Sequence, residues 1–424
     1  MPVRENLLRA DFTRQARRAL RFFSLFSFFC LLTTTLAGGN IFLNYTIAVE
    51  AGTVENIFFT PPPKVYEEIY ASFSNEAETT VMRMAFDALP EVELLPSPIA
   101  RREANQKIGV YIHMNNVAND QFVEREIARL KNLDNSAVVF DVKGSFVYFS
   151  SDSEIAKKFG LVKPLYDLPK IVEQFESAGI YTIARVIAAK DPQFAIQNPQ
   201  AWLTSPWTGQ PVPEWVDPAD AEVLAYNREI ISEIVVAGVD EINLDFMRYP
   251  DKFTSAFLGL TGQEKTDNIL NFVKMAREAI DSQKMDAVLS VDTFAILVWD
   301  FGRSEAALGQ DINALVGYAD IIAPMLYPAT FSRDNPQYVL KGKSHEYSTV
   351  FLTLEKYKDV LGKNTKKLRP WIQGYYVDIE QVRDQIEAVF DAGICGFTVW
   401  DIQNDYSEAY EILSELKIPD GCPI

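Results

Sequence analysis

Residues 219–250, which decide the fold, read ADAEVLAYNREIISEIVVAGVDEINLDFMRYP. The first part, 219–236, carries apolar residues at the spacing of an amphipathic helix. After a turn at Gly238, the second part, 241–246, is a short apolar run typical of a buried strand. A helix followed by a strand that is apolar on both faces is the unit from which parallel α/β sheets are built.

The same alternation runs through the rest of the chain. Eight strand candidates are expected at 108–114, 137–142, 181–188, 241–246, 288–294, 321–326, 370–376 and 396–401. Between them lie helical segments such as 121–133 and 380–392. Eight such units close more naturally as a barrel than they lie as an open sheet, so we predict a single (β/α)8 TIM barrel over residues 107–418. An open doubly wound sheet is the alternative, but no Gly-x-Gly-x-x-Gly or phosphate loop supports it.

An export signal precedes the predicted barrel. Four arginines between residues 14 and 21 are followed by the apolar run 22–37, so residues 1–45 read as a signal peptide or a membrane anchor. Residues 46–106 lack a sustained period, contain the prolines 61–63 and are expected to form a stalk. Residues 419–424 form a short tail. With the basic side in the cytoplasm, everything downstream is expected to be extracytoplasmic, membrane-anchored or secreted.

Composition narrows the function. A net charge of -18 argues against nucleic acid as a partner, because binding to phosphate depends on Lys and Arg. Only two histidines and three cysteines occur, so neither a metal centre nor another cofactor is expected. No Gly-x-Ser-x-Gly motif is present. Carboxylates and aromatic rings are abundant, which favours a carbohydrate as the partner. The sequence leaves the oligomeric state open.

Polar and aromatic residues stand at the carboxyl ends of nearly all the predicted strands, where barrel enzymes carry their chemistry. The candidates for contact with a sugar substrate are His113, Asp141, Lys143, Arg185, Arg248, Tyr249, Tyr327, Gln373, Trp400 and Asp401. For one pair a structural role is the alternative to substrate contact: Asp141 and Lys143 could bind each other across the barrel mouth without taking part in chemistry.

Cleavage of a glycosidic bond needs two carboxyl groups, and Asp245 and Asp292 on adjacent strands are the best pair. Arg248 follows Asp245 by three residues and could hold it ionised as the nucleophile, or form only a structural ion pair with it. Asp292 stands between apolar residues, which would raise its pKa and suit a general acid. The reverse assignment of the two roles stays open.

Two cysteines are expected to lie close together. Cys395 stands at the start of the eighth strand, and Cys422 follows the last helix, which runs back towards the same end of the barrel. A disulfide between them suits an oxidising compartment, and two unpaired thiols are the alternative.

Several motifs resemble those of the DUF4015 family of glycoside-hydrolase-type barrels. They include 215–218, 238–250, Ser290-Val291-Asp292, 323–328 and 396–401, and the resemblance covers nearly all of 107–405. It implies a barrel with an aspartate in the nucleophile position at the end of strand four, here Asp245. The family is distantly similar to α-amylase-like glycosidases, which keep a Glu at the end of strand five where this chain has Asp292.

Residues and resemblance together predict an extracytoplasmic glycoside hydrolase acting on a polysaccharide or cell-wall glycan. A second hypothesis is a non-catalytic carbohydrate-binding surface protein on a degenerate hydrolase barrel. A third, a metal-dependent lyase or a Schiff-base aldolase, would need Lys143 as its reactive amine or a metal cluster.

Overall fold

The computed structural model describes residues 103–251, 255–283, 286–300, 306–420 and 422. These residues belong to one compact unit, Pro98–Ile424. The predicted signal or anchor (1–45) and almost all of the predicted stalk (46–106) lie outside the described residues. Among the helices of the described part, none combines the length and the apolar character that a membrane span requires.

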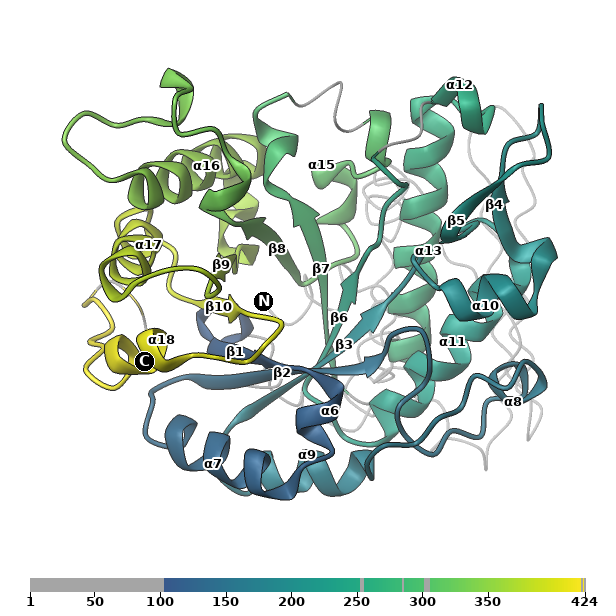
Figure 1. Cartoon of the computed structure of the whole chain (residues 1–424), viewed down its shortest axis with the longest axis horizontal. Coiled ribbons are helices and arrows are strands. Elements are labelled where there is room, and N and C mark those ends of the chain that lie inside the picture. Colours follow the sequence, from purple (N-terminus) through teal and green to yellow (C-terminus); the bar gives the residue numbers. More distant parts are fainter. Residues whose placement is uncertain (1–102, 252–254, 284–285, 301–305, 421, 423–424) are drawn as a thin grey trace, which may run out of the picture. The chain divides into compact units, whose positions relative to one another are not determined.

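Eight parallel strands form a closed barrel at the centre of this unit (Figure 1). In chain order they are β1 (Ile108–Ile112), β2 (Ser136–Lys143), β3 (Tyr181–Ile187), β6 (Glu241–Asp245), β7 (Val288–Phe294), β8 (Ile321–Leu326), β9 (Trp371–Gln373) and β10 (Phe397–Trp400). The barrel closes where β1 pairs with both β2 and β10, since Ile108 lies opposite Ser136 on one side and Phe397 on the other. The predicted (β/α)8 barrel is confirmed, and the open sheet is wrong.

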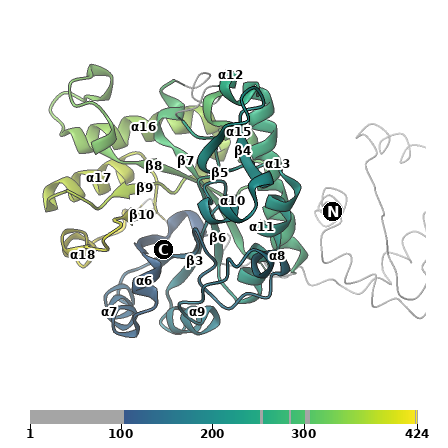
Figure 2. The ribbon, with the colours of Figure 1, turned by 45° about the vertical axis from the view of Figure 1, so that its right-hand side comes forward.

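Helices surround the barrel (Figure 1). They are α6 (Met114–Val117), α7 (Asp120–Leu130), α8 (Glu154–Lys158), α9 (Leu168–Glu176), α10 (Pro192–Gln197), α11 (Ala221–Val236), α12 (Ser255–Leu258), α13 (Gly262–Ser282), α15 (Ile312–Leu315), α16 (His345–Leu361), α17 (Ile379–Asp391) and α18 (Ser407–Leu413). A two-stranded hairpin, β4 (Trp202–Thr204) and β5 (Pro211–Val216), follows β3 and packs beside α10 (Figure 2).

Residues 219–250 show how the sequence produces one helix–strand unit of the barrel, α11 and β6. The Asp220 side chain caps α11 by accepting hydrogen bonds from the backbone N–H groups of Glu222 and Val223. Gly238 then turns the chain into β6 with φ 103°, a conformation that side chains other than glycine rarely adopt. The apolar face of α11 is buried against the barrel, so local signals and packing agree on the same structure.

Most strand bounds match the sequence prediction to within two residues, but β9 is shorter than the predicted 370–376. It ends at Gln373 because the chain then turns: Tyr376 adopts a left-handed backbone with φ 52°. Beyond Gln373 the backbone leaves the sheet and passes over the end of the barrel.

A buried ion pair lies inside the barrel at the amino ends of the strands, which we call the lower end. The guanidinium of Arg369 binds the carboxylate of Glu241 with N–O distances of 2.5 and 2.9 Å, and both side chains are almost fully buried. Arg369 also donates to the backbone carbonyl of Ala104 at 2.8 Å. Ala104 lies within the predicted stalk, so the packing of the barrel begins before the predicted boundary at residue 107.

A disulfide joins Cys395, just before β10, to Cys422, with a Cα–Cα distance of 5.5 Å. This is the pairing that the sequence predicts. It lies at the amino end of β10 and fixes the C-terminal tail to the same end of the barrel that holds the Glu241–Arg369 pair.

Candidate active site

The carboxyl ends of the eight parallel strands meet at one end of the barrel, which we call the mouth. Side chains that alternate into the barrel interior reach the mouth from several strands. Those that carry polar or aromatic groups are Tyr111, Asp141, Arg185, Asp245, Asp292, Tyr327, Gln373 and Trp400. All of these except Tyr111 were predicted from the sequence, and the barrel brings them together from distant parts of the chain.

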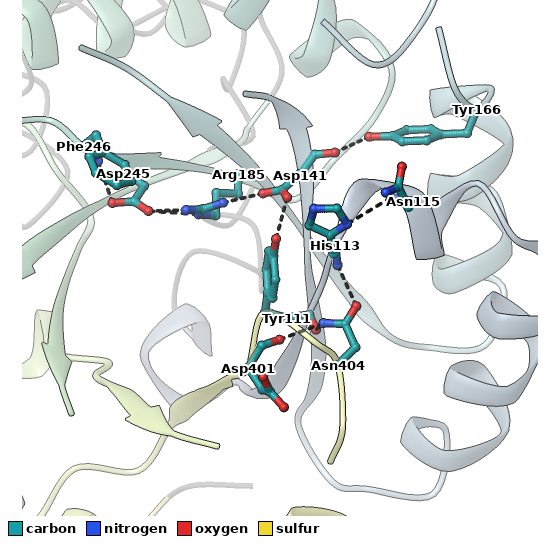
Figure 3. A network of polar contacts seen from close by, with 10 residues as sticks. All are labelled: Tyr111, His113, Asn115, Asp141, Tyr166, Arg185, Asp245, Phe246, Asp401 and Asn404. Carbon is teal, nitrogen blue, oxygen red and sulfur yellow. Dashed lines mark hydrogen bonds and ion pairs between the residues drawn. The ribbon is translucent and has the colours of Figure 1, made fainter. Parts of the chain in front are cut away.

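Arg185 bridges two carboxylates at the mouth (Figure 3). Its Nη1 donates to Asp141 Oδ1 at 2.5 Å and its Nε donates to Asp245 Oδ2 at 3.0 Å, while Nη2 contacts the same Asp245 oxygen. The Tyr111 hydroxyl donates to the other oxygen of Asp141 at 2.5 Å. Burial alone would lower the pKa of Arg185, but the two carboxylates outweigh it and raise that pKa, so the guanidinium stays charged.

Among the described residues, the donors to the Asp245 carboxyl group are N–H groups. Besides Arg185, the backbone N–H of Phe246 donates to Asp245 Oδ1 at 2.6 Å. Phe246 adopts a left-handed backbone with φ 52°, unusual for a bulky residue, directly after β6. Donors on both oxygens fix the orientation of the Asp245 side chain.

Asp292 lies in a different environment. Only 2% of its surface is exposed, and both of its hydrogen-bond donors, Asn243 Nδ2 at 2.8 Å and Trp371 Nε1 at 2.7 Å, bind the same oxygen, Oδ1. Burial, together with the negative charge of Asp245, raises the pKa of Asp292 well above its ordinary value. The environment of Asp292 therefore favours its protonated form more than that of an ordinary aspartate, and both donors bind Oδ1 and not Oδ2.

Four aromatic rings line one side of the mouth and form what we call the aromatic wall: Tyr111, Tyr327, Tyr375 and Trp400. The Trp400 ring centroid lies 5.4 Å from that of Tyr375, 5.6 Å from that of Tyr327 and 6.3 Å from that of Tyr111. Burial raises the pKa of Tyr327, and the negative charges of Asp292 and Asp245 raise it further. The Tyr327 ring therefore lies near both carboxyl groups. The rings of the aromatic wall and the carboxyl groups of Asp245 and Asp292 thus lie together at the mouth.

The predicted residues His113 and Asp401 lie at the edge of the mouth and are tied together by Asn404 (Figure 3). Asn404 Oδ1 accepts from the backbone N–H of His113 at 2.9 Å, and Asn404 Nδ2 donates to the backbone carbonyl of Asp401 at 2.9 Å. The Asp401 carboxylate accepts from the backbone N–H groups of Gln403 and Asp405, so it stabilises the turn after β10. The His113 ring caps α6, with Asn115 N–H 3.4 Å from its Nδ1.

The prediction for Lys143 is wrong. Its side chain is fully buried, with Nζ 2.9 Å from Asp191 Oδ2 and 2.6 Å from the carbonyl oxygen of Ile187. It packs 5.1 Å from the ring centroid of Tyr226 on α11, between the barrel and its outer helices. Lys143 therefore neither pairs with Asp141 nor reaches the mouth, and it cannot serve as a Schiff-base lysine there.

Two further predictions need correction. Arg248 does not hold Asp245, whose cation is Arg185; it donates to the Tyr249 carbonyl at 3.0 Å and is stacked among aromatic rings, 4.3 Å from the ring centroid of Phe294. Tyr249 is fully buried, and its hydroxyl accepts from Asn268 on α13 at 2.9 Å. The chain turns outward after Phe246, so Tyr249 is a core residue and not a substrate contact.

Gln373 reaches the mouth, but both ends of its amide are occupied. Its Oε1 accepts from the Ala329 N–H at 2.9 Å, and its Nε2 donates to the Tyr375 carbonyl at 2.8 Å. It thereby holds the segments that carry Tyr327 and Tyr375, and its direct contact with a sugar stays a prediction.

Sequence reasoning missed the side chains one layer below the strand ends. Tyr111, Asn243 and Trp371 each precede a predicted site position by two residues, and they hold Asp141 or Asp292 in place. Counting inward by the two-residue period of a strand could have found them. Asn404 could not be found this way, because it lies in a loop. In the described part of the chain no group of three or more His, Cys, Asp or Glu side chains could hold a metal ion.

Residues 109–406 match a family model described as DUF4015, "Putative glycosyl hydrolase domain". The chain belongs to the DUF4015 family. No curated protein matches the sequence. The resemblance seen in the sequence is thus confirmed, and the DUF4015 domain takes in all eight barrel strands except the first residue of β1.

Three of the solved structures to which this DUF4015 domain is similar are glycoside hydrolases by their printed names. The PgaB (BpsB) glycoside hydrolase domain from Bordetella bronchiseptica aligns with a TM-score of 0.58 at 16% identity, over 72% of this chain and 98% of that one. The β-amylase catalytic domain from Paenibacillus polymyxa gives 0.50 at 12% identity, over 73% and 98%. The β-galactosidase from the psychrophilic Marinomonas ef1 gives 0.51 at 12%, over 73% and 59%. At these identities the likeness concerns the fold alone.

Proposed function

We propose that this DUF4015 protein hydrolyses a polysaccharide or cell-wall glycan outside the cytoplasm, with Asp245 and Asp292 as its two catalytic carboxyl groups. One observation carries the proposal: two neighbouring carboxyl groups at the barrel mouth have opposite environments. In the described part of the chain, the donors to Asp245 are N–H groups, including those of the cation Arg185, whereas Asp292 is buried and its pKa is raised. Such a pair separates the acid from the base of glycoside cleavage.

The environments favour one assignment of roles. Asp292, protonated on Oδ2, donates its proton to the oxygen of the leaving sugar. Asp245, as a carboxylate, acts on the opposite side as nucleophile or as base for water while positive charge develops on the sugar ring. The reverse assignment would require a proton on Asp245 beside Arg185 and a negative charge on Asp292, whose 2% exposure leaves it little contact with water. Both changes are unfavourable.

The residues around the pair suit a sugar substrate. Within the aromatic wall, Tyr327, Tyr375 and Trp400 are partly exposed and can offer ring faces to the C–H surface of a sugar. Arg185 keeps Asp245 and Asp141 in a fixed orientation, so they need not reorganise during the reaction.

Two features support the location. The sequence begins with a basic and then apolar segment typical of export, and a disulfide joins Cys395 to Cys422. Alkylation of free thiols in intact cells tests this: a protein in an oxidising compartment is expected to leave both cysteines unmodified until it is reduced. Labelling of both without reduction would contradict the location.

The decisive experiment compares the purified full-length protein with Asp245→Asn and Asp292→Asn on a panel of α- and β-linked glycans and aryl glycosides. We expect wild-type product release, and a loss of kcat/KM of about 10²–10⁴-fold for Asp292→Asn on substrates with poor leaving groups. Asp120→Asn serves as a matched control, because it makes the same change at an exposed aspartate on α7, away from the mouth. Full activity in both catalytic variants would refute the mechanism.

A non-catalytic carbohydrate-binding protein is the second candidate. The observation in its favour is that both oxygens of Asp245 already accept hydrogen bonds in the structure. If no glycan in the panel is cut, while one binds equally well to wild type and to both Asn variants, this second function replaces the first.

A further inference from the structure

The aromatic wall continues past the mouth to a fifth ring, that of Tyr376. The rings of Tyr375 and Tyr376 lie 5.7 Å apart at an interplanar angle of 80°. Tyr375 in turn stands 5.4 Å from Trp400. The series therefore leads from the buried acids, through half-buried rings, to the outside of the barrel.

Tyr376 is exposed to an unusual degree for an aromatic residue. Ninety-one per cent of its surface is accessible, more than for any other large apolar side chain in the described part of the chain. Single exposed aromatic residues are common, but this one also adopts a left-handed backbone with φ 52°. That conformation costs a non-glycine residue about 1–3 kcal/mol. The ring is thus held outward by a strained turn, and the contact with the edge of the neighbouring Tyr375 ring leaves most of its surface exposed.

We propose that Tyr376 forms an outer subsite that stacks against a sugar ring of the same glycan chain, some residues away from the bond at Asp245 and Asp292. This inference rests on the proposed function and deepens it, because it makes the substrate an oligosaccharide or polymer. A tyrosine suits this use, since it offers a large rigid surface at the cost of ordering only two side-chain torsions. Binding at a remote ring adds affinity that short glycosides cannot reach.

Two substitutions at Tyr376 distinguish the contribution of its ring from that of its backbone conformation. Tyr376→Asn removes the ring but keeps a residue that tolerates the left-handed conformation, and Tyr376→Phe keeps the ring and loses only the hydroxyl. Leu165→Ala, at another exposed apolar position, is the matched control for loss of surface area.

The test measures binding and hydrolysis by the full-length protein with disaccharides through hexasaccharides of α-1,4-glucan, β-1,4-glucan and β-1,4-linked N-acetylglucosamine. We expect Tyr376→Asn to weaken binding of the hexasaccharide between about twofold and tenfold and to leave the disaccharide and aryl glycosides unchanged. Tyr376→Phe and Leu165→Ala should match wild type.

Two results would overturn the subsite: a wild-type protein that binds no hexasaccharide more tightly than its disaccharide, or a Tyr376→Asn variant with unchanged preference for length. Binding is measured apart from turnover, which keeps the two proposals distinguishable. Length-dependent binding that is lost in Tyr376→Asn, without product release, sustains the subsite while the hydrolase function fails.

Discussion

Asp245 and Asp292 carry the same carboxyl group, and their partners alone separate their chemistry. Asp245 lies beside a buried cation, Arg185, and a backbone N–H. Asp292 is buried, and its two donors among the described residues, Asn243 and Trp371, are neutral. The charge of Asp245 further favours the protonated form of Asp292. Roles in such a pair are therefore a property of the neighbouring residues, not of the two aspartates themselves.

The raised pKa of Asp292 predicts the pH dependence of hydrolysis. A general acid works only while protonated, so kcat/KM should fall as pH rises through that pKa, which burial places well above 3.8. In Asp292→Asn this fall of kcat/KM at high pH should be absent. Trp371→Phe removes a hydrogen bond that lowers the pKa of Asp292, so in this variant the fall of kcat/KM should occur at higher pH. A fall at the same pH in wild type and in both variants would exclude Asp292 as the acid. The measurement is the profile of kcat/KM against pH for all three proteins.

At the scale of elements, the β2 strand shows what alternation can and cannot predict. The two-residue period puts Asp141 and Lys143 on one face of a regular strand, as the sequence prediction assumed. The pairing of β2 with β3 shifts register between these two residues, and the shift turns Lys143 towards Asp191. All eight strands could be predicted from their apolar runs, and Asp141, Arg185, Asp245 and Asp292 from strand ends. An irregularity such as this one depends on tertiary packing and leaves no local signal.

Asn404 links the loop after β10 to the start of the barrel. Asn404 makes four hydrogen bonds: its Oδ1 accepts from His113 N and Asn116 Nδ2, and its Nδ2 donates to the carbonyls of Tyr111 and Asp401, all at 2.8–2.9 Å. It does so with a left-handed backbone, φ 58°. These bonds join the first strand of the barrel to the loop that follows the last one.

We therefore predict that Asn404→Gly, which tolerates the backbone but removes every bond, lowers the free energy of unfolding by about 2–4 kcal/mol. Asn404→Ala should cost roughly 1 kcal/mol more, because alanine resists the left-handed conformation. Denaturant titration of the three proteins measures both differences. If Asn404→Gly is as stable as wild type, the loop is held by other contacts.

At the scale of the whole molecule, the two ends of the barrel have separate tasks. The mouth carries the proposed chemistry. The opposite end is closed by the Glu241–Arg369 pair and by the Cys395–Cys422 disulfide. Conservative change at the lower end should therefore affect stability and leave the reaction intact, as is usual for barrels of this type.

Removal of the disulfide tests this division. The two cysteines are 27 residues apart, and for a loop of that size the chain-entropy model gives a stabilisation of about 3–4 kcal/mol. The double variant Cys395→Ser/Cys422→Ser is expected to lose about this much unfolding free energy while keeping its kcat/KM at temperatures where it stays folded. Thermal unfolding of wild type with and without reductant should show the same difference. An equal loss of kcat/KM in the folded variant would link this end to the mouth.

The closure of the barrel through β1 and β10 also fixes the order in which the molecule can be completed. A ribosome delivers β1 first among the strands and β10 last, so the first strand waits for its second neighbour until almost the whole barrel has emerged. During that time β1 and the most recent strand each present a row of unpaired backbone groups. Pairing between the ends of a long chain is slow. A chain that stops before β10 keeps both rows exposed, a geometry that favours association between chains over folding.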